Sequence, residues 1–254
     1  MFGVLLMVIA QAASAQPGPP GPPPVPLDRN AALNRAIDLY NQKEYAPALT
    51  AFREMAEAGN LEAIRYLGVM YGSGQGVAAD YEEALKWLRK AAFSSDSQAM
   101  CNIGSLYFQG MGGRPDYREA MVWFQKAALT GNSQGAYNVG VLYRDGLGVA
   151  VDFEKALAYF HKAADQGEDL AMNSLGVMYQ RGQGVTTDYL QALRWFRAAA
   201  AQGNAAAMFN IGLSYEAGTG VAANRTEATA WYRKAAAAGN PEATRSLQRL
   251  EAAK

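Results

Sequence analysis

An internal repeat of 36 residues constrains this chain more than any other feature of its sequence. Two columns keep that step without a slip: Gly68, Gly104, Gly140, Gly176 and Gly212, and Tyr71, Tyr107, Tyr143, Tyr179 and Tyr215. The alanine pair that begins at Ala91 recurs at the same spacing. Self-similarity at one fixed period is typical of a stacked solenoid, in which each unit packs only against its neighbours.

Each repeat has the pattern of two helices. Ala63, Leu67, Met70 and Tyr71 share one helical face, and the segment from residue 81 to residue 92 repeats that periodicity. Polar columns that suit N-caps precede the first helices (Asn60, Asp96, Asn132, Glu168, Asn204, Asn240) and the second helices (Asp80, Asp116, Asp152, Asp188, Asn224). Glutamates three residues after some of these caps predict capping boxes, at Glu83, Glu119 and Glu227. Glycines follow most second helices, where a left-handed residue is favoured: Gly59, Gly131, Gly167, Gly203 and Gly239.

All four tryptophans occupy one column of the repeat. They are Trp87, Trp123, Trp195 and Trp231, and Tyr159 fills the gap. We expect this column to pack between units, so that truncating one of its members costs as much as removing a large core side chain.

The recurring set resembles the Sel-1-like repeat, a member of the tetratricopeptide superfamily. It consists of Ala63, Leu67-Gly68, Met70-Tyr71, Gly74-x-Gly76-Val77, Asp80-Tyr81, Glu83-Ala84, Trp87 and Lys90-Ala91-Ala92. The resemblance implies an all-α, right-handed solenoid of antiparallel helix pairs. We expect a tetratricopeptide-like pair at 29–59, five Sel-1-like repeats at 60–239 and a C-terminal capping helix at 240–254.

Departures from the repeat are few: Gly113 replaces the loop valine, Arg225 the aromatic residue after the cap, and Ser95 a terminal glycine. The resemblance further implies adaptor work, because family members scaffold complexes or bind regulatory partners, often in the bacterial envelope. A cysteine-rich branch of the family carries paired cysteines in each repeat, and this sequence has the single Cys101.

The N-terminal residues have the pattern of an export signal. A short apolar stretch, Phe2 to Ala10, is followed by the small-residue motif Ala13-Ser14-Ala15. We therefore predict a signal peptide at 1–15, cleavage after Ala15 and a periplasmic or secreted protein. No Lys or Arg precedes the apolar stretch, so an uncleaved tail is the alternative.

Residues 16–28 form a proline-rich segment, because Pro17 to Pro26 hold seven of the ten prolines. Such a segment favours extended polyproline II and predicts a stiff linker. Recognition of this segment by a proline-binding partner is the alternative.

Charge and composition argue against several classes of ligand. Lys plus Arg and Asp plus Glu both number 23, whereas nucleic-acid surfaces carry a basic excess. No apolar run reaches the roughly 18 residues of a membrane span. One Cys and one His are too few for a His/Cys metal site, so we expect no metal and no cofactor.

Three features that suggest catalysis have simpler explanations. The Gly-x-Gly loops resemble phosphate cradles, but a helix precedes each loop and glycine explains the turn. His161 shares a column with Arg89 and Arg197 on the expected solvent face, next to a column of lysines. We identify no catalytic partner for it at a fixed helical offset, and a catalytic base would need one. Cys101 has no identifiable activating base, so we expect an inert, partly covered thiol, with an intermolecular disulfide as the alternative. We predict no catalytic residues.

A candidate binding surface lies on the back of the first helices. In tetratricopeptide-like stacks the first helices line the concave face. We count positions along each first helix from its small residue, which is Ala63, Ala99, Gly135, Ala171 or Ala207. The residues two, three and six positions later (offsets +2, +3 and +6) have mostly aromatic, aliphatic and amide side chains. The predicted site consists of Arg65, Tyr66, Val69, Cys101, Asn102, Ser105, Tyr137, Asn138, Val141, Asn173, Val177, Phe209 and Asn210. Asn102, Asn138 and Asn210 repeat at one offset and suit an amide ladder along an extended peptide. The alternative is tight curvature that buries this face against itself.

The sequence therefore favours a non-catalytic adaptor of the cell envelope that binds a peptide or protein partner in its concave groove. An envelope-remodelling or hydrolytic enzyme is the second hypothesis, and it would need a catalytic set that breaks the repeat at one place. A structural spacer with no groove ligand is the third.

Overall fold

The computed structural model describes residues 29–252, and this part of the chain consists of helices joined by short loops. The helices are α1 (Arg29–Asn41), α2 (Tyr45–Glu57), α3 (Leu61–Ser73), α4 (Tyr81–Phe93), α5 (Ser97–Gln109), α6 (Tyr117–Leu129), α7 (Ser133–Asp145), α8 (Phe153–Ala164), α9 (Asp169–Arg181), α10 (Tyr189–Ala201), α11 (Ala205–Ala217), α12 (Arg225–Ala237) and α13 (Pro241–Ala252). The predicted signal peptide and proline-rich linker lie outside the described residues.

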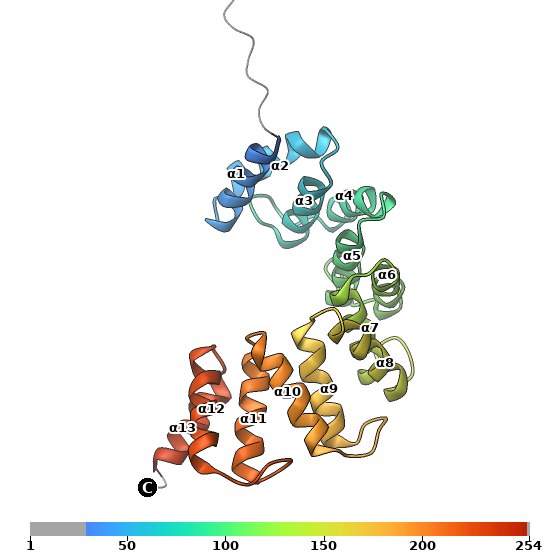
Figure 1. The fold of residues 1–254 in the computed structure, drawn as a ribbon. Coiled ribbons are helices and arrows are strands. Elements are labelled where there is room, and N and C mark those ends of the chain that lie inside the picture. The colour runs from blue at the N-terminus through green and yellow to red at the C-terminus, as the bar shows by residue number, and fades with distance from the viewer. Residues whose placement is uncertain (1–28, 253–254) are drawn as a thin grey trace, which may run out of the picture.

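Consecutive helices pack as antiparallel pairs and the pairs stack into a curved solenoid (Figure 1). The pair α1/α2 precedes five pairs with the repeat sequence, and α13 packs on α12 at the end of the stack. In Figure 1, α3, α5 and α7 follow the inner side of the curve, whereas α4, α6 and α8 follow the outer side. The expected all-α solenoid is confirmed.

The helix ends form largely as the polar columns predict. Every second-helix cap from Asp80 to Asn224 accepts a backbone N–H with its side chain, as do the Asn and Asp members of the first-helix column. Glu168 is the exception: its carboxylate makes no cap bond and accepts a hydrogen bond from Ser133 instead. Ser95 adopts the left-handed conformation in place of glycine, with φ of 62°.

Only one half of each predicted capping box forms among the described residues: the cap side chain accepts the backbone N–H of Glu83, Glu119 or Glu227, and the glutamate side chain makes no return bond. The backbone N–H of each cap is already satisfied, because it donates to the carbonyl of the tyrosine nine residues earlier, as Asp80 does to Tyr71 at 2.8 Å and Asp116 to Tyr107 at 2.9 Å. The long loop of this repeat thus closes on its own backbone, and the glutamate side chain is not needed for that bond.

The large side chains that the second helices bury fully belong to the column after the tryptophans. Its members are Leu88, Phe124, Phe160, Phe196 and Tyr232, all less than 2 % exposed. The tryptophans pack against the core and between units, where Trp195 contacts His161 of the preceding repeat, but they are partly exposed. Lysines lie over some of these indoles, for example with Lys126 Nζ 4.2 Å from the centre of the Trp123 ring.

The glycine that recurs in every first helix (Gly68, Gly104, Gly140, Gly176 and Gly212) is explained by the close crossing of the two helices of each repeat. A Cβ on Gly140 would lie 2.6 Å from Cε1 of Phe160, closer than real carbon contacts allow. The buried ring of the second helix therefore needs the bare backbone of the first. This close approach fixes how the two helices of a repeat cross.

The glycine loops pack on the preceding repeat. Gly148 has φ of 71°, and a Cβ there would lie 2.8 Å from the carbonyl carbon of Tyr117, at the start of α6. Glycine is thus required both for the turn and for contact between neighbouring units. This explains the repeated loop without a bound phosphate.

Candidate protein-binding surface

Twelve of the thirteen predicted site residues are partly exposed on the first helices of the repeats. They are Arg65, Tyr66, Val69, Asn102, Ser105, Tyr137, Asn138, Val141, Asn173, Val177, Phe209 and Asn210, and we call them the inner surface. They come from α3, α5, α7, α9 and α11, and α3 contacts α5 directly across the repeat boundary. The chain's own side chains therefore cover this row only in part.

Cys101 does not belong to the inner surface, which corrects the sequence-based prediction. Its side chain is fully buried, with Sγ 3.6 Å from Gln134 Oε1 and 3.9 Å from Asn138 Nδ2. Burial raises the pKa of the thiol to about 12. The +2 offset faces the next repeat, so long side chains there reach the surface while the short cysteine stays covered. The neutral, enclosed thiol is inert toward disulfide formation in the folded chain.

Two other residues at the +2 offset make polar contacts with the following repeat. Arg65 Nε lies 3.2 Å from Asp96 Oδ2, and Asn173 Oδ1 accepts a hydrogen bond of 3.0 Å from Asn210 Nδ2. Arg65 Nη2 also lies 3.8 Å from Glu62 Oε1, so two carboxylates surround this guanidinium. These contacts connect successive first helices, and the two carboxylates outnumber the Arg65 guanidinium at this end of the row.

Amide side chains extend the same connections. Gln98 Nε2 donates to Asn102 Oδ1 at 3.1 Å and lies 3.3 Å from Gln134 Oε1, while Asn132 Nδ2 donates to Gln98 Oε1 at 3.1 Å. These bonds position the amides of neighbouring repeats in a row. The sequence pattern predicted the asparagine column but not the glutamines that hold it.

The three asparagines of the expected ladder keep part of their hydrogen-bonding capacity. Asn102 uses its oxygen, so its Nδ2 has no partner among the residues that the structure describes. Asn138 and Asn210 use their nitrogens, and their Oδ1 atoms are equally free within the described chain. One donor group and two acceptors therefore remain, and they match the C=O and N–H groups of a peptide backbone.

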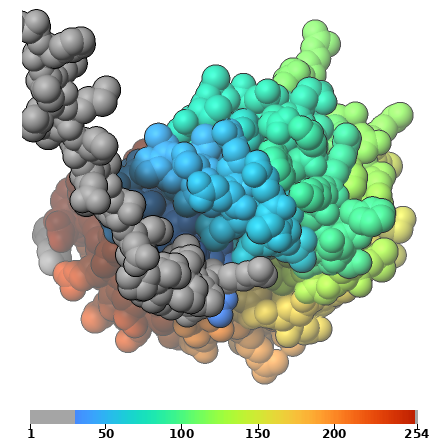
Figure 2. All heavy atoms as spheres, turned by 90° about the horizontal axis from the view of Figure 1, so that it is seen from above, coloured from blue at the N-terminus to red at the C-terminus, as the bar shows by residue number. Residues whose placement is uncertain are grey.

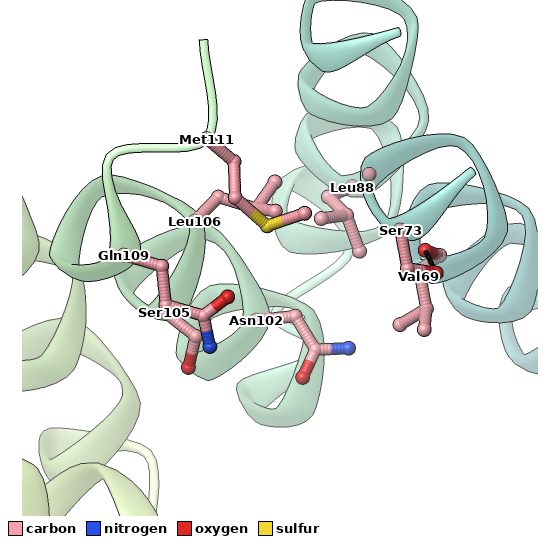
Figure 3. Close-up of a pocket in the computed structure, with 9 residues that line it drawn as sticks. Val69, Ser73, Leu88, Asn102, Ser105, Leu106, Gln109 and Met111 are labelled. Atoms are coloured by element: carbon pink, nitrogen blue, oxygen red, sulfur yellow. Dashed lines mark hydrogen bonds between the residues drawn. The ribbon is translucent and has the colours of Figure 1, made fainter. Parts of the chain in front are cut away.

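Two hollows open beside Asn102, at the start of the row. The larger, about 160 Å³, is lined by Val69, Gly72, Ser73, Leu88, Asn102, Ser105, Leu106, Gln109 and Met111. The smaller, about 140 Å³, is lined by Glu62, Arg65, Tyr66, Val69 and Asn102. In Figure 3 the Asn102 side chain extends toward Val69, while Leu88 and Met111 face one another across the larger hollow. Residues of the α5–α6 loop and the ends of α3 and α5 were not predicted to belong to the site.

A second polar cluster lies at the C-terminal end of the stack. Glu216 accepts hydrogen bonds from Tyr232 Oη at 2.6 Å and from Arg249 Nη2 at 2.8 Å, and hollows of about 330 and 410 Å³ border it. The hydrogen bond from Arg249 lowers the pKa of Glu216, and burial raises that of Tyr232. Because Arg249 belongs to α13, this cluster ties the terminal helix to the last repeat.

The remaining candidates for chemistry have structural partners. His161 packs edge-on against Trp195, with ring centres 5.3 Å apart. Within residues 29–252, no group of three or more His, Cys, Asp or Glu side chains is placed to hold a metal ion. None of the helices described has the length and apolarity to cross a membrane.

The Sel1 repeat model matches five consecutive stretches of the chain, at residues 61–92, 97–132, 133–168, 169–204 and 205–240. This chain belongs to the Sel1 repeat family. The matched stretches correspond to the helix pairs α3/α4 to α11/α12, and all but the first include the turn that follows the pair. No curated protein sequence matches the chain.

Solved structures with similar folds include other Sel1 repeat proteins. The Sel1 repeat protein from Oxalobacter formigenes is 33% identical, with a TM-score of 0.76 over 85% of this chain and 88% of that one. The protective antigen c5321 of uropathogenic Escherichia coli, described as having an SLR fold, is 34% identical with a TM-score of 0.70, over 87% of this chain and 48% of its own length. The immunity protein Pa5087 from Pseudomonas aeruginosa is 22% identical, with a TM-score of 0.60 over 86% of this chain and 85% of that one, which shows a common fold.

Proposed function

We propose that this Sel1 repeat protein is a non-catalytic scaffold or adaptor of the cell envelope, and that it binds a peptide or protein partner on its inner surface. The observation that carries the proposal is the row of partly exposed aromatic, aliphatic and amide side chains on successive first helices. A face selected only for hydration would be rich in Lys and Glu, whereas exposed mixed apolar surface marks interaction sites. Unused amide groups along the row support an extended peptide as the ligand.

The chemistry of the surface supports binding over catalysis. The inner surface supplies amides and aromatic rings, and a hydrolytic enzyme would need an activated nucleophile with its base or a pair of carboxylates. The Cys101 thiol, which lies beneath this surface, is held neutral by burial. The likeness in fold to proteins described as immunity proteins agrees with a protein partner.

The proposed location, in the periplasm or outside the cell, rests on the predicted signal peptide. N-terminal sequencing of the mature protein should then begin at Gln16. Recovery of a chain that retains Met1 from the cytosol would contradict this location without touching the binding proposal.

The binding proposal can be tested by comparing two triple variants. Asn102, Asn138 and Asn210 are replaced together by alanine, and the control replaces Glu82, Arg118 and Glu154, one exposed position that repeats on the second helices. Each variant is cross-linked in the envelope, and captured partners are compared by mass spectrometry. We expect the inner-surface variant to lose partners that the control retains, with equal helix content by circular dichroism. Equal capture by both variants would place the binding site elsewhere.

A further inference from the structure

One position of the repeat breaks the pattern near the end of the first helix. The column contains a side chain in four repeats and none in the first: Gly72, Phe108, Arg144, Gln180 and Glu216. The break coincides with the larger hollow beside Asn102, since Gly72 is one of its walls.

In the second and third repeats the residue of this column lies against the buried ring of the second helix. The rings of Phe108 and Phe124 have centres 6.4 Å apart, and the Arg144 guanidinium lies 5.8 Å from the centre of the Phe160 ring. The chain thus fills this space with its own side chains. In the first repeat it does not, because the column residue is Gly72.

The second helix of the first repeat also has a smaller side chain facing this space. The buried column has Leu88 there, where three later repeats have phenylalanine. A Cβ on Gly72 would lie 2.9 Å from Leu106 Cδ2, so a larger residue would displace the neighbouring helix's leucine. Leu106 thus lies directly against Gly72, and the hollow of about 160 Å³ remains beside these residues and Leu88.

The size and lining of the hollow indicate what it accepts. An apolar cavity of about 150 Å³ can hold a benzene-sized molecule, which is comparable to the end of one large aliphatic or aromatic side chain. Val69, Leu88, Leu106 and Met111 supply apolar walls, and none of the lining residues is charged. A charged group that entered would lose hydration without gaining a counter-ion. The complementary occupant is therefore one uncharged apolar side chain.

We propose that this hollow is a specificity pocket for a single Leu, Met or Phe side chain of a bound extended peptide. Asn102 stands at its wall with Nδ2 free within the described chain, so it can donate to a backbone carbonyl of the same peptide. The pocket sets the register of the peptide along the inner surface, since the hollow at the corresponding positions of the fourth and fifth repeats, beside Gln180 and Leu213, is lined also by the charged Glu216 and Arg249. This inference rests on the proposed function and adds the chemistry of the ligand.

The pocket can be tested without the natural partner. The full-length protein, with methyl-labelled methionine, is titrated with N-acetyl-leucinamide, N-acetyl-alaninamide and N-acetyl-glutamate amide. The Met111 methyl resonance, assigned from Met111→Leu, should shift saturably with leucinamide and stay unchanged with the glutamate amide. Alaninamide should bind about tenfold more weakly or worse, because it buries less apolar surface.

Variants at exposed positions keep the test independent of folding. Gln109→Trp covers the pocket mouth, and Arg181→Trp places the same residue at the equivalent exposed position of α9 as a control. We expect the leucinamide shift to disappear in Gln109→Trp and to persist in Arg181→Trp. The pocket proposal is wrong if the wild type shows no saturable shift, or if the shift persists in Gln109→Trp. A Met111 shift that follows protein dilution and is not displaced by leucinamide would assign the hollow to a second copy of the chain and equally overturn the proposal.

The outcomes separate this inference from the proposed function. If the triple asparagine variant loses partners but the wild type does not bind leucinamide, only the pocket proposal is wrong. Leucinamide binding together with unchanged partner capture would exclude the inner surface as the partner site, and with it the role of the pocket in placing the peptide, while the hollow itself would still bind an apolar side chain.

Discussion

Replacing Gly140 by alanine tests whether close helix crossing, and not backbone flexibility, determines the glycine column. Gly140 lies in the interior of α7, where helix propensity alone predicts that alanine stabilises by about 1 kcal/mol. The structure predicts the opposite sign, because the new methyl group would lie 2.6, 2.7 and 3.1 Å from Cε1, Cδ1 and Cζ of Phe160. The two expectations differ in direction, so one substitution decides between them.

The magnitude follows from the balance of these two effects. Overpacking of a tight core costs about 1–3 kcal/mol, and the upper part of that range applies because the Phe160 ring is fully buried and three of its atoms lie within 3.1 Å of the new methyl position. After subtracting the gain in propensity, we expect a net loss of about 2 kcal/mol. For a chain of this size that loss lowers Tm by about 4–8 °C.

Urea unfolding followed by circular dichroism measures the effect, and a double-mutant cycle with Phe160→Ala isolates its cause. When the ring is absent, Gly140→Ala should no longer destabilise and should recover the propensity gain of about 1 kcal/mol. A single variant Gly140→Ala that is as stable as the wild type, with an unchanged denaturant slope, would refute the crossing geometry described above.

Three further predictions concern burial and charge. Phe124→Ala should cost about 3–5 kcal/mol, whereas its neighbour Trp123→Ala should cost about 2 kcal/mol, because the space left at the partly exposed indole opens to solvent and adds no cavity; equal losses in urea unfolding would contradict this ranking. Cys101 should resist a thiol reagent at pH 8 in the native protein and react once the protein is unfolded, because burial raises its pKa to about 12; rapid labelling of the native protein would show an open site. The Arg249 hydrogen bond lowers the pKa of Glu216 in the folded protein, so this carboxylate stabilises the fold above the ordinary glutamate range and that contribution is lost as the pH falls through the folded pKa. The stability difference between wild type and Glu216→Gln should therefore shrink between pH 7 and pH 3, and a constant difference would rule out the linkage.

Local chemistry made most of the helix boundaries predictable. A side chain such as Asp188 caps a helix through its own N-terminal turn, and Gly146 ends one through its own left-handed backbone, so neighbours in sequence carry the relevant information. The prediction of an N-cap was wrong at Glu168, where a residue distant in sequence occupies the side chain that was expected to cap the helix. Glu168 bonds Ser133 of the preceding repeat instead of capping α9.

The candidate surface was predictable in outline but not in its depth. The 100° spacing of residues around a helix placed twelve of its thirteen members at partly exposed positions. It could not show that Cys101 is covered, because that depends on how far α7 reaches over α5. The pocket was equally inaccessible, since its walls come from α3, α4, α5 and the following loop.

By itself the sequence determined the period, the type of each element and the family, because all three depend on residue identity at fixed spacing. The tertiary structure decided which aromatic column is buried and which glycines lie against a side chain of another helix. It also decided where an unfilled space remains beside Gly72. Those outcomes depend on distances between residues of different helices. A helix pair can bury either of two adjacent columns, and only the crossing of the packed helices selects between them.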